Sequence, residues 1–128
     1  MLKQIAVATF TVLTAFTISP LPIHAQQGSN QLPTDPALIL SLGRAQNLAR
    51  QAAEKANGGL NNYRADISMY GPPSQAPYKY NSDGSWTFTF QGRRPESSVP
   101  YVETAVTVSQ DGSRVNVDYN RISGPGGQ

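Results

Sequence analysis

Two proline-containing loops hold the side chains best suited to recognise a partner. They span residues 70–80 and 92–101, and the candidate binding residues in them are Tyr78, Tyr80, Arg93, Arg94 and Tyr101. Tyrosine and arginine are enriched at the centres of binding interfaces, and prolines stiffen the loops that present them. The alternative is that the tyrosines cover a sheet edge and that the prolines prevent edge-to-edge aggregation.

Three carboxylates, those of Asp66, Glu103 and Asp118, are the candidates for acid/base chemistry. A pair about 5 to 9.5 Å apart could act on a glycosidic bond, provided that a desolvated setting raises the pKa of the acid. Alternation along the predicted strands places all three on a solvent-facing side of a sheet, together with Arg64 and Arg114. We therefore expect ionised, salt-bridged carboxylates and no catalytic residue.

The chain offers little else for catalysis or metal binding. It has no cysteine, and its one histidine, His24, lies in a segment that we expect to be removed. This excludes Ser-His-Asp and Cys-His sites as well as zinc sites made of Cys or His. Residues 81–85 (NSDGS) lack the downstream glutamate of a calcium loop and are predicted to form a hairpin turn, as are Asp111 and Gly112. The sequence predicts no metal and no cofactor.

The first 25 residues have the pattern of a secretory signal peptide. A positive start at Lys3 precedes an apolar run that is shorter than the roughly 20 residues of a membrane span, and Pro20 and Pro22 interrupt it. We expect cleavage after Ala25, export to the periplasm or the extracellular space, and no stable membrane insertion afterwards. The predicted organisation is a signal peptide (1–25), a flexible leader (26–34), one α+β domain (35–122) and a disordered tail (123–128).

Charge argues against a nucleic-acid partner. Only 14% of the residues are charged, and of the ten Lys and Arg the signal segment removes Lys3, leaving nine against eight Asp and Glu. Binding to nucleic acid needs a clustered basic face, which this distribution does not provide.

A helix is predicted after the leader. Asp35 is a suitable N-cap, Pro36 fits the first helical position, and residues 57–59 (NGG) are a strong stop. Gly43 either allows another helix to cross this one closely or belongs to weakly formed first turns of the helix. One face is apolar and largely alanine, so the helix should lie close to a flat surface. That face holds Leu38, Leu42, Ala45, Ala49, Ala52 and Ala56.

Four strands are predicted after the double glycine, because the apolar period changes to two. The inward-facing residues are, strand by strand, Tyr63, Ala65, Ile67 and Met69; Trp86, Phe88 and Phe90; Val102, Thr104, Val106 and Val108; and Val115, Val117 and Tyr119. Trp86 lies nearest the turn, and we expect it to be partly exposed. A turn at Asp111 and Gly112 places Val108 opposite Val115 and Val106 opposite Val117. Tyr78 to Tyr80 either leads into the second strand or forms its own short hairpin, which would bring the two loops together.

The predicted fold class is α+β: one N-terminal helix packed on a four-stranded antiparallel meander sheet. This order of elements resembles cystatin-like and PepSY-like modules, exported or envelope domains that bind proteins, inhibit enzymes or assist maturation. The inhibitory Gln-x-Val-x-Gly loop of cystatins is missing. The stretches DGSWTFTF, GRRPES and VTVSQDGSRVNVDYN are similar to those of small secreted bacterial, particularly cyanobacterial, proteins. That likeness supports the fold and implies no activity.

The expected function is that of an exported, non-catalytic domain that binds a protein or peptide partner in the cell envelope. A small envelope hydrolase that uses carboxylates and a purely structural periplasmic protein are the alternatives. The sequence leaves the oligomeric state open.

Overall fold

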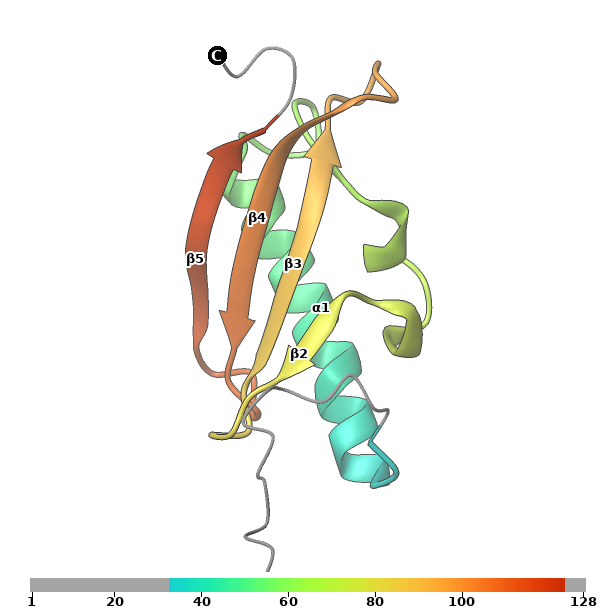
Figure 1. The fold of residues 1–128 in the computed structure, drawn as a ribbon, viewed down its shortest axis with the longest axis vertical. Coiled ribbons are helices and arrows are strands. Elements are labelled where there is room, and N and C mark those ends of the chain that lie inside the picture. Colours follow the sequence, from blue (N-terminus) through green and yellow to red (C-terminus); the bar gives the residue numbers. More distant parts are fainter. Residues whose placement is uncertain (1–32, 124–128) are drawn as a thin grey trace, which may run out of the picture.

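One helix lies along one face of a five-stranded antiparallel sheet (Figure 1). The computed structural model describes residues 33–123, so the predicted signal peptide, most of the leader and residues 124–128 of the predicted tail lie outside it. Helix α1 precedes strands β1 to β5 and two short 3-10 helices, η1 and η2, and no helix in the described part of the chain is long and apolar enough to cross a membrane. The predicted α+β class, with a helix on an antiparallel sheet, is confirmed.

The bounds of the elements follow the chain in order. They are α1 (Pro36–Ala56), β1 (Arg64–Ala65), η1 (Ile67–Met69), η2 (Pro73–Gln75), β2 (Tyr78–Tyr80), β3 (Trp86–Arg93), β4 (Pro100–Val108) and β5 (Val115–Ile122).

The ends of α1 are those that its capping residues predict. The Asp35 carboxylate accepts a hydrogen bond from the backbone N–H of Ala37 at 2.8 Å, and Pro36 occupies the first turn. The helix ends at Ala56 with Asn57 as its C-cap, and the next residue, Gly58, has a φ of 89°. Its buried apolar face differs slightly from the predicted one, because Ala53 is buried whereas Ala56 is exposed.

The prediction of a four-stranded meander is wrong, because two short strands share one edge of β3. Arg64 and Ala65 of β1 pair with Arg93 and Gly92, whereas β2 pairs with the other end of β3, from Phe88 to Trp86. β3 then pairs with β4, and β4 with β5.

The first predicted strand ends early because Asp66 caps the short helix η1. Its carboxylate accepts hydrogen bonds from the backbone N–H (2.9 Å) and the hydroxyl (2.6 Å) of Ser68, which turns the chain into η1. The buried Gln46 of α1 then donates to the carbonyls of Ser68 (3.2 Å) and Gly71 (3.1 Å). The turn shifts the alternation of side chains, so that Ile67, predicted to face inward, is 84% exposed.

Both predicted hairpins form. Tyr80 lies opposite Trp86 across the turn at residues 81–85, and Val108 and Val106 lie opposite Val115 and Val117. The pairing of β4 with β5 is irregular between Ala105 and Val106, and the extra residue in β5 places Tyr119 opposite Ala105. Tyr119 therefore does not face the helix as predicted, and its hydroxyl donates to Glu103 at 2.9 Å.

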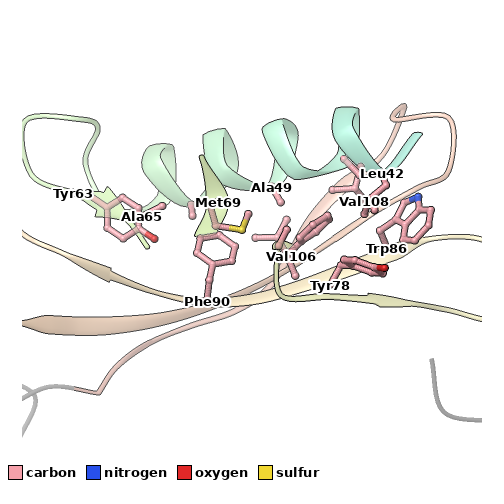
Figure 2. Packing of buried hydrophobic residues seen from close by; sticks show 14 of the residues in the cluster. Leu42, Ala49, Tyr63, Ala65, Met69, Tyr78, Trp86, Phe90, Val106 and Val108 are labelled. Carbon is pink, nitrogen blue, oxygen red and sulfur yellow. The ribbon is translucent and has the colours of Figure 1, made fainter. Parts of the chain in front are cut away.

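The core fills the layer between α1 and the sheet (Figure 2). Small side chains on the helix, among them Ala45, Ala49 and Ala53, allow it to approach the aromatic residues of β3. Trp86 is only 1% exposed, contrary to the prediction of partial exposure. Its indole N–H donates to the Ser41 hydroxyl at 3.0 Å, and this hydroxyl donates to the Gln110 carbonyl at 2.7 Å. The helix thus covers the turn end of β3.

Candidate functional site: a cleft with two paired arginines

The five predicted binding residues fall into two groups at opposite ends of β3. Tyr78 and Tyr80 belong to β2 and lie beside Trp86, with ring centroids 5.6 Å and 4.4 Å from the indole. Tyr78 is buried, and this burial raises the pKa of its hydroxyl. These two tyrosines therefore contribute to packing around Trp86.

Arg93, Arg94 and Tyr101 form the second group, where β3 ends and β4 begins. Tyr78 lies opposite Phe88, five residues before Arg93, which corresponds to about 17 Å along a strand. The Arg94 guanidinium lies over the ring of Tyr101, 5.0 Å from its centroid. The Arg93 guanidinium donates to the carbonyls of Arg94, Pro95 and Ser97, at 3.3, 3.3 and 2.9 Å, and so holds the connection to β4.

The 92–101 loop lines a cleft to which the 70–80 loop contributes only its first residue, Tyr70, and none of its prolines. The cleft has a volume of about 720 Å³ and lies between β1 with η1 on one side and the β3–β4 connection on the other. Its lining residues are Leu60, Arg64, Ala65, Asp66, Ile67, Tyr70, Gln91, Gly92, Arg93, Ser98 and Pro100.

Two arginines of the cleft lie directly opposite each other. Arg64 of β1 pairs in register with Arg93 of β3, and side chains at such positions share one face of the sheet. Like charges directly opposite each other are destabilising. Within residues 33–123 the ion pairs join Arg50 to Glu54 and Arg121 to Glu103, so neither arginine of the pair lies within ion-pair distance of a carboxylate. The Asp66 carboxylate also lines the cleft, where it accepts hydrogen bonds from Ser68, and the cleft therefore keeps a net positive charge.

The Arg64 guanidinium is held against the chain that leads into β1. It donates to the backbone carbonyls of Leu60 and, at 3.4 Å, of Tyr63. Both arginines are half-buried. Because backbone carbonyls already orient the two guanidinium groups, a bound anion would need little further ordering of these side chains.

Exposed apolar side chains surround this charge. Ile67 is 84% exposed, Leu60 51% and Tyr70 48%. Tyr70 is fixed by Arg50 of α1, whose guanidinium lies 4.8 Å from the centre of the tyrosine ring. The cleft thus combines two arginines and one aspartate with an apolar wall, and its net positive charge suits a ligand that carries a carboxylate beside an apolar group.

The three carboxylates considered for acid/base chemistry each have their own hydrogen-bond donors. Asp66 accepts from Ser68, Glu103 accepts from the Tyr119 hydroxyl, and Asp118 accepts from the Thr107 hydroxyl at 2.6 Å. Glu103 also pairs with Arg121 at 3.7 Å. Among the described residues there is no cluster of three or more His, Cys, Asp or Glu side chains able to hold a metal ion.

Sequence reasoning missed the residues that complete the cleft. Arg64 was expected on a solvent-facing side, but its pairing with Arg93 depends on which strand lies beside β3, and this is not apparent from alternation. Ile67 was placed in the core, although the Asp-x-Ser pattern at Asp66 indicates a capped turn that would expose it.

In comparisons with protein-family models, with curated proteins and with solved structures, no match to this chain was found.

Proposed function

We propose that this chain is an exported, non-catalytic binding domain whose cleft accepts a segment of a protein or peptide partner in the cell envelope. The segment carries an Asp, Glu or terminal carboxylate next to an apolar side chain. The pairing of Arg64 with Arg93, neither of which forms an ion pair within residues 33–123, is the observation that carries this proposal. The sequence pattern of residues 1–25 supports export.

The cleft has the composition of a binding surface. Arginine and tyrosine supply much of the energy at interface centres, and Ile67 and Leu60 offer apolar area that gains from being covered. A carboxylate bound in the cleft would be attracted by the positive charges of both Arg64 and Arg93.

The test is a set of fluorescent twelve-residue peptides in which one acidic residue flanks one apolar residue, with amide and alanine counterparts. Fluorescence anisotropy measures their affinity. Arg64→Gln should weaken the binding of the acidic peptides by about tenfold, as expected for the loss of one charge-assisted hydrogen bond. Ile67→Ser should weaken all apolar peptides without changing the preference for the carboxylate.

Arg114→Gln is the matched control, because Arg114 is an exposed arginine outside the cleft. It should leave the affinity unchanged. If no acidic peptide binds more tightly than its amide counterpart, or if Arg64→Gln and Arg114→Gln have equal effects, the cleft is not the site and the proposal fails.

A further inference from the structure

The two edges of the sheet differ in how they are protected. The edge beside β3 carries β1 and β2, which have two and three residues, and Pro72, Pro73 and Pro77 lie between them. Short strands and prolines are the usual means of preventing another strand from pairing at an edge. β5 forms the opposite edge with eight residues and no proline, and pairs only with β4 in the described part of the chain.

The backbone of β5 offers hydrogen bonds on its free side. The Ser109 N–H donates to the Arg114 carbonyl at 2.9 Å, so the carbonyl of Arg114 points toward β4. Backbone groups alternate in direction along an antiparallel strand, and those of Val115 and Val117 therefore point away from β4, to the open edge. Both valines are also partly exposed, at 40% and 36%.

We propose that β5 pairs in antiparallel register with β5 of a second copy of this chain, with Asn116 at the two-fold axis. This register places Val115 of each copy opposite Val117 of the other. At both positions the backbone groups point to the edge, so Val115 and Val117 of the two copies can form ladder hydrogen bonds, and the irregularity that follows Val117 ends the ladder there. The side chains of both valines lie on the helix-covered face, because they pair with the buried Val108 and Val106, and they would cover each other.

Charge favours a second copy as the occupant of this edge. The same register places Arg114 of each copy opposite Asp118 of the other, which gives two pairs of opposite charge. Arg114 forms no ion pair within residues 33–123, although it lines a cleft together with Asp83 and Asp111, from which its guanidinium would turn to reach the second copy. The Asp118 carboxylate accepts from Thr107 at 2.6 Å and Asn116 at 2.7 Å, and a carboxylate has further lone pairs for a guanidinium. Self-complementarity of this kind is what a two-fold interface requires.

Charge reversal tests both the dimer and its register. We expect sedimentation equilibrium to show a monomer–dimer equilibrium for the full chain. Arg114→Asp and Asp118→Arg should each weaken self-association by about tenfold or more, since each creates two like-charged pairs. An equimolar mixture of the two variants should form a heterodimer with restored affinity, because every pair in it has opposite charges again.

Val117→Pro is a second, independent test. It removes an N–H that faces the open edge and leaves the hydrogen bonds between β4 and β5 in place, so it should abolish dimers in a folded chain. Circular dichroism verifies folding, and if Val117→Pro unfolds the chain, the charge reversals still decide. A monomer at all concentrations, or a dimer that neither the reversals nor their mixture affects, would overturn the proposal.

Discussion

Gly92 and Tyr63 together determine how closely β1 lies against β3. A Cβ atom on Gly92 would lie 1.9 Å from Cε2 of Tyr63, so the tyrosine ring occupies the space that any larger residue would need. Tyr63 is fully buried, and this burial raises the pKa of its hydroxyl. Ala65 pairs with Gly92, and Arg64, the residue between Tyr63 and Ala65, is thereby held opposite Arg93.

Gly92→Ala should therefore destabilise the protein by about 1 to 3 kcal/mol, the usual cost of an overpacked core. Urea denaturation followed by circular dichroism measures the change. Gly71→Ala is the matched control, because a Cβ at Gly71 meets no atom within 4 Å. Equal stability of the two variants would contradict the close contact between Tyr63 and Gly92.

Asp111 links stability to pH through the turn between β4 and β5. Hydrogen bonds from the backbone N–H and hydroxyl of Ser113 and from the hydroxyl of Ser109 lower its pKa from 3.8 to about 2. A carboxyl group with a lowered pKa stabilises the folded state above its unfolded pKa, and this contribution disappears as the pH falls through the folded value.

In Asp111→Asn, the free energy of unfolding should therefore fall less steeply between about pH 4 and pH 2 than in the parent chain. Thermal unfolding at a series of pH values measures both slopes. Ser113→Ala removes one of the donors and should give an intermediate slope. Parallel profiles for the parent and Asp111→Asn would show that these hydrogen bonds do not favour the ionised form.

The side chains of β3 alternate between the helix-covered face of the sheet and its solvent-facing face. Trp86, Phe88 and Phe90 are buried against the helix, whereas Thr89 and Gln91 are exposed on the other face. On the solvent-facing side, the hydroxyls of Thr87 and Thr107 lie 2.8 Å apart, and the Thr87 hydroxyl also accepts a hydrogen bond from the Asn81 amide at 2.8 Å. The two faces therefore tolerate truncation differently.

Phe88→Ala should cost about 3 to 5 kcal/mol, through lost burial and a residual cavity, whereas Thr89→Ala should cost well under about 1.5 kcal/mol. Chemical denaturation of both variants measures the difference. Similar losses would mean that the inward face is assigned incorrectly, since a register error of one residue exchanges the two faces.

Local signals allowed the helix, the two hairpins and the helix-facing side of β3 to be predicted. Asp35, Pro36 and residues 57–59 determine the ends of α1, and Gly84 and Gly112 take the positive φ values that their turns require. The path from Ala65 to Tyr78 was not predictable in this way. It depends on Gln46 and Arg50, which come from α1 and bind the carbonyls of Ser68, Gly71 and Met69. The cleft shares this limitation, because its arginines meet only after β1 has paired with β3.

At the scale of the whole molecule, the two proposed surfaces lie at opposite edges of the sheet. The cleft lies beside β1, and the proposed dimer contact is on β5. Strands β3, β4 and β5 lie side by side in that order, so β3 and β4 separate the two surfaces (Figure 1). Sites that are more than about 10 Å apart and share no partner usually act independently. A dimer formed through β5 would also carry its two clefts at the outer edges of one continuous sheet.

Because the surfaces are separate, each should respond to its own substitutions only. Arg64→Gln should weaken peptide binding and leave self-association unchanged, whereas Asp118→Arg should weaken self-association and leave the affinity of one cleft for a peptide in solution unchanged. On a surface coated densely with peptide, the parent dimer should dissociate more slowly than the Asp118→Arg monomer, because two clefts can bind at once. Surface plasmon resonance at low and high peptide density measures this. A dissociation rate that does not depend on density, in a chain shown to be dimeric, would mean that its two clefts cannot bind together, and the arrangement of a continuous sheet with outward clefts would be wrong.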